Sequence, residues 1–100
     1  MSFKIKYLPE TIIDREKIRL YLSTFYAGTS RKFFALLKEK TARLKEFPYS
    51  CPVYEDESDY RKLIVDDYLV FYIVNEGDNI IEIHRIIHGS KNLEDVLRFR

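Results

Sequence analysis

Apolar residues follow a helical period in the first half of the chain and a strand period in the second half. They recur every three or four positions over residues 12–26 and 31–46, which predicts two amphipathic helices. Because only a few residues around Gly28 connect them, the helices should pack as an antiparallel hairpin. Ahead of them, residues 3–7 alternate apolar and basic side chains, which predicts a short half-buried strand.

The ends and buried faces of the two helices can also be predicted. Thr11, with Asp14 three residues later, has the pattern of an N-terminal cap, and Pro48 should stop the second helix. Phe34 and Phe47 extend the apolar face of the second helix. The helical residues expected in the core are Ile18, Leu22, Phe25, Phe33, Leu37 and Leu44.

After Pro48 the pattern predicts strands over residues 60–65, 68–74 and 80–87. Their connections are too short for a crossover, so they should form an antiparallel meander. The last two runs are apolar on both faces and should lie inside the sheet with cover on each side, placing Val70 or Phe71, and Ile83, in the core. Residues 92–99 predict a short terminal helix. The order βααβββ(α) indicates an α+β fold, a helix hairpin packed on a small antiparallel sheet that includes residues 3–7.

Length and composition indicate one domain over residues 1–100, with 46% hydrophobic and 15% aromatic residues to build a core. A single cysteine, Cys51, excludes an intramolecular disulfide and suits a reducing compartment. No signal peptide is apparent, and no apolar run approaches the roughly 20 residues of a membrane helix. We therefore expect a cytoplasmic protein that makes no use of a membrane. The chain has only three glycines and no glycine-rich phosphate-binding loop, so the sequence does not support nucleotide hydrolysis.

Charge is distributed unevenly although the net charge is only +1. Residues 1–50 carry 11 basic and 5 acidic side chains, and residues 51–100 carry 6 basic and 11 acidic ones. This asymmetry can mark a surface for an anionic partner, but ordinary solvated helix faces rich in Lys and Arg are the preferred interpretation.

Two segments of the second half carry a family resemblance. They read Asp-Tyr-Leu-Val-Phe-Tyr-Ile-Val over residues 67–74 and Ile-His-Arg-Ile-Ile-His-Gly-Ser-Lys-Asn-Leu-Glu-Asp-Val-Leu over residues 83–97. With the chain length and the helix hairpin, they resemble the RelE/ParE superfamily of bacterial toxins, whose small βααβββ architecture matches the whole chain. The resemblance implies a growth-inhibiting toxin of a type II toxin–antitoxin system, of the kind associated with plasmid stabilisation. It also implies a cognate antitoxin partner, no cofactor and no metal.

The superfamily divides by target, and the candidate residues bear on which branch applies. ParE-like members inhibit DNA gyrase, whereas RelE-like members cut mRNA on the ribosome with basic residues and a His, Glu or Tyr. If this chain is a ribonuclease, its candidate catalytic residues are Arg61, His84 and His88. However, Leu63 and Leu69 stand where ribonuclease relatives often have basic residues, and residues 93–100 contain no tyrosine. These departures favour a ParE-like binder over an enzyme. A relative that only binds an antitoxin is a third alternative.

His84 and His88, four residues apart on one predicted strand, should point to the same face. We expect them to have structural roles or to contact the target or antitoxin. The minor alternatives are catalysis and a metal site completed by Glu82. Arg85, among isoleucines, must reach an acidic partner or water, and the candidate partners are Glu55, Asp56, Glu57 and Asp59. The residues expected to contact the target or antitoxin are Arg61, Arg85, His88, Ser90 and Lys91.

Overall fold

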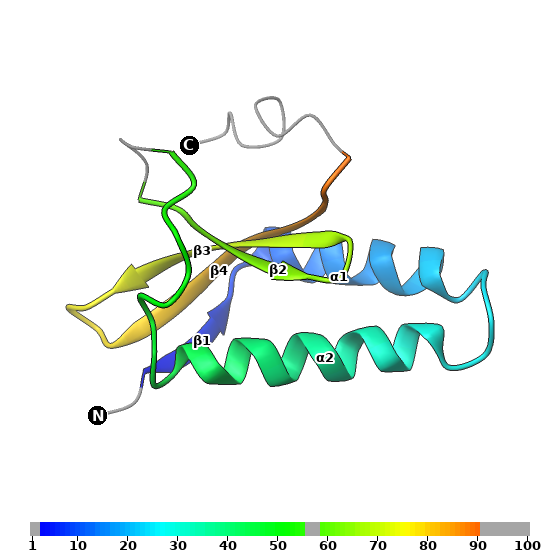
Figure 1. The fold of residues 1–100 in the computed structure, drawn as a ribbon, viewed down its shortest axis with the longest axis horizontal. Coiled ribbons are helices and arrows are strands. Elements are labelled where there is room, and N and C mark those ends of the chain that lie inside the picture. Colours follow the sequence, from blue (N-terminus) through cyan, green and yellow to red (C-terminus); the bar gives the residue numbers. More distant parts are fainter. Residues whose placement is uncertain (1–2, 56–58, 91–100) are drawn as a thin grey trace.

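The computed structural model describes residues 3–55 and 59–90, which form two helices packed on a four-stranded sheet (Figure 1). The predicted fold class and element order are confirmed, while the helix expected over residues 92–99 lies outside the described residues. The elements are β1 (Lys4–Tyr7), α1 (Pro9–Leu22), α2 (Thr29–Leu44), β2 (Arg61–Val65), β3 (Tyr68–Asn75) and β4 (Ile80–His88).

The strands lie in the order β1-β4-β3-β2. The meander β2–β3–β4 is antiparallel as predicted, but β1 runs parallel to β4, with Lys4 opposite Ile80 and Tyr7 opposite Ile83. The expectation of an antiparallel sheet is therefore wrong for this one strand. The argument from short connections applies only to the meander. In the sequence, both helices separate β1 from the other strands, and a connection of that length allows β1 to run in either direction.

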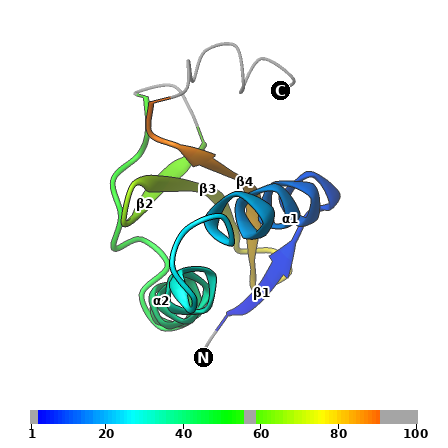
Figure 2. The same cartoon turned by 90° about the vertical axis from the view of Figure 1, so that its right-hand side faces the viewer.

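The main core lies between the two helices and one face of the sheet (Figure 2). Ile18 of α1 and Phe33, Leu37 and Leu44 of α2 are buried there, as predicted. The strands contribute the other buried members of this core: Val65, Tyr68, Val70, Tyr72, Ile81, Ile83 and Ile86. The opposite face has a smaller core of Tyr60, Phe71 and Ile87, which explains why β3 and β4 are apolar on both sides.

Both ends of α1 differ from the prediction. Pro9 begins the helix, where its missing N–H costs nothing, so Thr11 lies inside the first turn and is not the cap. The helix ends at Leu22, and beyond it the N–H groups of Thr24 and Phe25 donate to carbonyl groups only three residues back. The hydroxyls of Ser23 and Thr24 also donate to carbonyl oxygens of this last turn.

The predicted apolar faces extend too far as a result. Phe25, expected in the core, lies beyond α1 and is 54% exposed, while Leu22 is only partly buried. Phe47, beyond the end of α2, is likewise exposed. Gly28 adopts φ +90° at the start of α2, a left-handed conformation that allows the chain to reverse between the helices.

The first turns of α1 continue the edge of the sheet where β1 ends. The Leu8 N–H donates to the Ile83 carbonyl over 3.1 Å, and the Thr11 hydroxyl donates to the same oxygen over 2.7 Å. One turn later, the Asp14 carboxylate accepts a bond of 3.0 Å from the Ile86 N–H. The helix thus satisfies backbone groups of β4 that would otherwise lie at an open edge. None of the helices in the described ranges is long and apolar enough to cross a membrane.

Candidate functional site

An irregularity in β4 decides where its histidines point. Phe71 is opposite Arg85, but Tyr72 is opposite Ile83, so His84 is an extra residue without a counterpart on β3. As a consequence, Ile83 and Ile86 both face the helices although they are three residues apart.

The prediction that His84 and His88 share a face is therefore wrong. His84 contacts Tyr60 on the side away from the helices. His88 packs on the Tyr68 ring in a T-shaped arrangement, and Tyr68 in turn packs on Phe33 of α2. Because the two imidazoles lie on different faces, they cannot act together as an acid and a base or as ligands of one metal ion.

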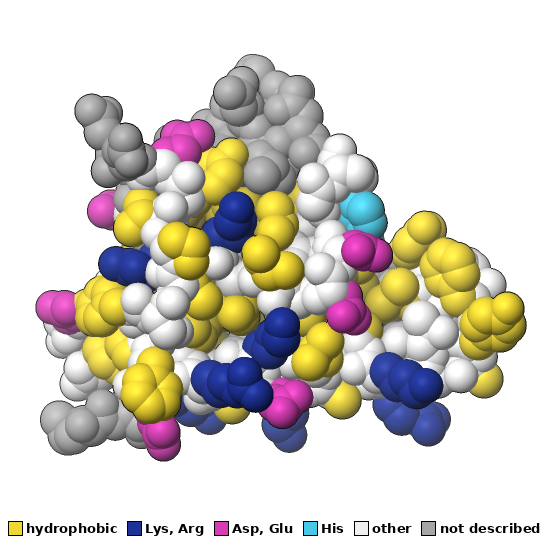
Figure 3. All heavy atoms as spheres, viewed as in Figure 1, with side chains coloured by type: hydrophobic (Ala, Val, Ile, Leu, Met, Phe, Trp, Pro, Cys, Tyr) yellow, Lys and Arg dark blue, Asp and Glu magenta, His cyan; other side chains and the backbone are white. Residues whose placement is uncertain are grey.

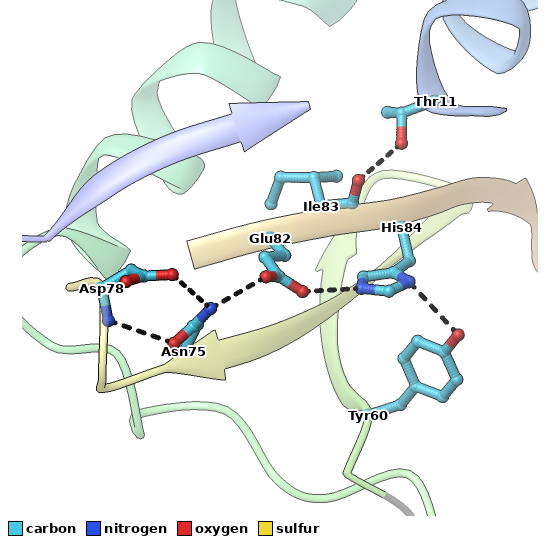
Figure 4. A network of polar contacts seen from close by, with 7 residues as sticks. All are labelled: Thr11, Tyr60, Asn75, Asp78, Glu82, Ile83 and His84. Atoms are coloured by element: carbon cyan, nitrogen blue, oxygen red, sulfur yellow. Dashed lines mark hydrogen bonds and ion pairs between the residues drawn. The ribbon is translucent and has the colours of Figure 1, made fainter. Parts of the chain in front are cut away.

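His84 belongs to a closed polar network (Figure 4). Its Nδ1 is 3.3 Å from the Tyr60 hydroxyl, and its Nε2 is 3.2 Å from a Glu82 carboxylate oxygen. The other Glu82 oxygen accepts a bond of 3.1 Å from the Asn75 amide. This hydrogen bond, and next the one from His84, lower the pKa of Glu82. The distances fit the tautomer in which Nε2–H donates to Glu82 and Nδ1 accepts a hydrogen bond from the Tyr60 hydroxyl.

The network fixes the imidazole of His84 and offers little access to a substrate. Tyr60 is 2% exposed, so its hydroxyl is not presented to solvent. Among the described residues, no three His, Cys, Asp or Glu side chains are grouped closely enough to hold a metal ion. The arrangement therefore has the character of a structural support for the sheet.

Arg85 is bound by Asp14 of α1, a partner that the sequence prediction did not include. Its Nε and Nη2 donate to the two oxygens of Asp14 over 2.7 and 2.9 Å. The hydrogen bond to Asp14 raises the pKa of Arg85. The expected partners were Glu55, Asp56, Glu57 and Asp59, of which Asp56 and Glu57 lie outside the described residues. The partner that the structure shows, Asp14, is 71 positions away in the sequence.

Arg61 lies in a different environment from both histidines. It is opposite Tyr72, and residues paired in this way share a face, which here is the face toward the helices. Its Nη1 donates to the Cys51 carbonyl over 2.7 Å, and its guanidinium carbon is 4.9 Å from the centroid of the Tyr49 ring. Arg61, His84 and His88 thus occupy three separate environments, and the structure does not bring the candidate catalytic residues together.

Three of the predicted contact residues meet in a cleft between α1 and the end of β4. The α1–β4 cleft has a volume of about 460 Å³, and Arg85, His88 and Ser90 line it. His88 Nδ1 accepts a bond of 3.1 Å from the Ser90 N–H and lies 2.7 Å from the Ser90 hydroxyl. Lys91, the fourth candidate here, lies outside the described residues, and Arg61 is elsewhere.

Helix α1 supplies the wall of the cleft that sequence reasoning missed. Asp14, Lys17, Ile18 and Tyr21 line it from that side. Their spacing of three or four residues was visible in the sequence. However, Asp14 was assigned to a cap, and nothing in the local pattern related α1 to residues 85–90.

Comparison with known proteins agrees with this architecture. Residues 5–93 match the family model described as the ParE toxin of the type II toxin–antitoxin system parDE. None of the curated proteins matches the sequence.

Several solved structures share the fold at low sequence identity. The chain is similar to a structure of the chromosomal ParDE system from P. aeruginosa, with TM-score 0.72 and 14% identity over 87% of this chain and 96% of that chain. It is also similar to the RelBE2 complex from Mycobacterium tuberculosis, with TM-score 0.64 and 13% identity over 88% and 99%. The intact E. coli RelBE complex gives TM-score 0.64 and 12% identity over 90% and 100%.

Proposed function

Because the chain belongs to the family of ParE toxins of type II toxin–antitoxin systems, we propose that it arrests growth by binding a protein target such as DNA gyrase and that a cognate antitoxin neutralises it. In this proposal the toxin performs no chemistry of its own. It acts by occupying a surface of its target.

The separation of the candidate catalytic residues carries this proposal. Cleavage of RNA at a ribose 2′-hydroxyl requires a proton acceptor, a proton donor and a cation around one phosphate. Here Arg61 is held by the Cys51 carbonyl, His84 by Tyr60 and Glu82, and His88 by Ser90. Each side chain therefore already has a structural role, and the three do not surround a common position in the described residues.

The α1–β4 cleft is the surface we assign to the antitoxin. It combines apolar walls with the polar groups of Lys17, Arg85, His88 and Ser90, a mixture that suits a peptide segment with apolar and acidic side chains. The complexes of RelBE2 from M. tuberculosis and RelBE from E. coli pair related folds with antitoxins, which supports a similar partnership here. Lys91 follows Ser90 in sequence and is included in this proposed contact.

A ribosome-dependent mRNA endonuclease is the alternative function, and the Glu82–His84–Tyr60 network is the observation in its favour. A carboxylate that orients an imidazole is a common arrangement for a general base. In this alternative, His84 would become a proton acceptor once a substrate displaced Tyr60 from it.

Two measurements on the purified protein separate the functions. The first is inhibition of DNA supercoiling by gyrase, and the second is cleavage of mRNA during translation in a cell-free system. We expect inhibition of supercoiling and no toxin-dependent cleavage. Cleavage without an effect on gyrase would contradict the proposal.

Three alanine substitutions make the same distinction in cells. Arg61→Ala, His84→Ala and His88→Ala should each leave growth arrest within a few-fold of the wild type, provided that melting curves show a folded protein. Loss of a catalytic group from a ribonuclease would instead lower the rate by roughly 10²–10⁴. A single folded variant that no longer arrests growth, with mRNA cleavage by the wild type, would establish the enzyme.

A further inference from the structure

The turn of the helix hairpin exposes a cluster of large apolar side chains. Leu20 and Tyr21 at the end of α1, and Phe25 and Tyr26 in the connection, are all more than half exposed, and Tyr26 reaches 87%. The rings of Tyr21 and Phe25 touch edge to face with centroids 5.2 Å apart. Figure 3 shows hydrophobic side chains gathered at the right-hand end of the molecule, where Figure 1 draws this turn. A contiguous exposed patch of this kind indicates an interaction surface.

The same region is entirely basic in its charged residues. We call residues 17–32 the hairpin tip; it contains Lys17, Arg19, Arg31 and Lys32 and no acidic residue. All 16 acidic residues of the chain therefore lie outside it. Arg19 is paired with Glu16, directly before the tip, through a bond of 3.1 Å from its Nε. A partner that covers this surface should carry acidic groups around an apolar centre.

We propose that the hairpin tip is the surface that docks the toxin's protein target, through an apolar surface of the target that is flanked by carboxylates. The inference rests on the proposed function and names the surface that function uses. Tyrosine, phenylalanine and arginine are the side chains enriched at protein interfaces. Four of them, Tyr21, Phe25, Tyr26 and Arg31, occur here within eleven residues.

The charges of the tip argue against a permanent interface and against a second copy of this chain as its occupant. A permanent interface is more apolar and resembles a divided core, whereas cations between exposed aromatic side chains suit a partner that is bound and released. A second copy of this chain, paired about a two-fold axis at the tip, would place basic residues against basic residues. An acidic partner avoids this repulsion.

The tip and the α1–β4 cleft share residues, which gives the antitoxin a means to neutralise the toxin. Lys17 and Tyr21 belong to the tip and also line the cleft. An antitoxin segment seated in the cleft would therefore cover part of the target-docking surface. Target and antitoxin would then compete for the toxin.

Matched substitutions test the surface. Phe25→Ser removes an exposed aromatic side chain from the tip, and Phe47→Ser removes one of similar exposure, 62% against 54%, from the segment just after α2. Arg31→Glu reverses a charge of the tip, and Lys38→Glu reverses one on the same helix outside it. None of the four side chains is buried, so the variants should fold, which melting curves verify.

The readouts are growth arrest at graded expression and inhibition of supercoiling by purified gyrase. We expect Phe25→Ser and Arg31→Glu each to require roughly tenfold or more toxin for half-inhibition in both assays, and the two controls to match the wild type. Tip variants as potent as the wild type would overturn the proposal.

Further outcomes separate this inference from the proposed function. Loss of growth arrest in the tip variants, with a wild type that leaves gyrase unaffected, would reject gyrase and support the docking surface on another target. Tip variants that still arrest growth but escape rescue by the co-expressed antitoxin would assign the tip to the antitoxin and overturn the proposal. Two other results, with the potency of the tip variants unchanged, would also overturn the proposal. One is that the wild type sediments with vesicles of phosphatidylcholine and phosphatidylglycerol and the tip variants do not; the other is that the wild type dimerises in light scattering and the tip variants do not.

Discussion

The bond between Asp14 and β4 should be one of the largest single polar contributions to stability. Asp14 is 6% exposed, and its carboxylate accepts bonds from Arg85 Nε at 2.7 Å, Arg85 Nη2 at 2.9 Å and the Ile86 N–H at 3.0 Å. Asp14→Ala leaves the guanidinium and the backbone N–H without this acceptor. We expect the free energy of unfolding to fall as a result.

The magnitude follows from the burial of the two partners. Removing one member of a buried ion pair costs about 3–5 kcal/mol. The Arg85 side chain is 21% exposed, so water can replace part of the lost bonding, and the lower end of about 3 kcal/mol is expected. For a protein of this size, that loss should lower the melting temperature by about 12–24 °C. Asp14→Asn keeps an acceptor for the Ile86 N–H and should cost less.

Urea unfolding followed by circular dichroism measures these losses, and Glu16→Ala on the exposed side of α1 is the control. A double-mutant cycle with Arg85→Met isolates the pair, for which we expect a coupling of about 1–3 kcal/mol. An Asp14→Ala variant within about 1 kcal/mol of the wild type, or a cycle with no coupling, would refute the view that this contact secures α1 to the sheet.

Three further variants probe other buried or half-buried polar groups. Thr11→Val removes the 2.7 Å bond to the Ile83 carbonyl and should cost about 1–2 kcal/mol in urea unfolding, whereas the same change at exposed Thr24 should be nearly neutral. The hydrogen-bond partners of Glu82 lower its pKa, so Glu82 contributes to stability above pH 4.5, the ordinary carboxyl value, and this contribution is lost as the pH falls through the lower folded pKa. Glu82→Gln should therefore reduce the loss of stability at acidic pH, and an unchanged loss would contradict this. Burial raises the pKa of Tyr72, so the contribution of Tyr72 to stability is present below pH 10.0, the ordinary value, and is lost at higher pH. Tyr72→Phe should therefore show a smaller fall in melting temperature at alkaline pH, and a fall equal to that of the wild type would contradict this.

The limits of the sequence prediction are clearest at the ends of the helices. Periodicity located both helices correctly because the buried stripe repeats at 3.6 residues. It carried the first helix too far, to Tyr26, because apolar residues keep the helical spacing beyond Leu22, where the backbone bonds change to the three-residue spacing of a turn. The start of the first helix was predicted too late because threonine is a common N-cap residue. In the structure the Thr11 hydroxyl instead donates to the Ile83 carbonyl.

What the sequence determined by itself is the set of elements, most of the core and the family. These depend on local pattern: helical stripes, strands that are apolar on both faces, and the two motifs at residues 67–74 and 83–97. Each can be read within a window of about fifteen residues, so no knowledge of the remaining chain is required.

The tertiary structure alone decided how distant residues meet. In the fold, β1 runs parallel to β4 and Asp14 pairs with Arg85. His84 is an extra residue of β4 relative to β3, and for this reason it lies on the other face of the sheet from His88. Strand side chains alternate with a period of two, so one inserted residue moves every later side chain to the other face. That register is fixed by how β3 and β4 fill the two cores against the helices and Tyr60, which no local stretch of sequence specifies.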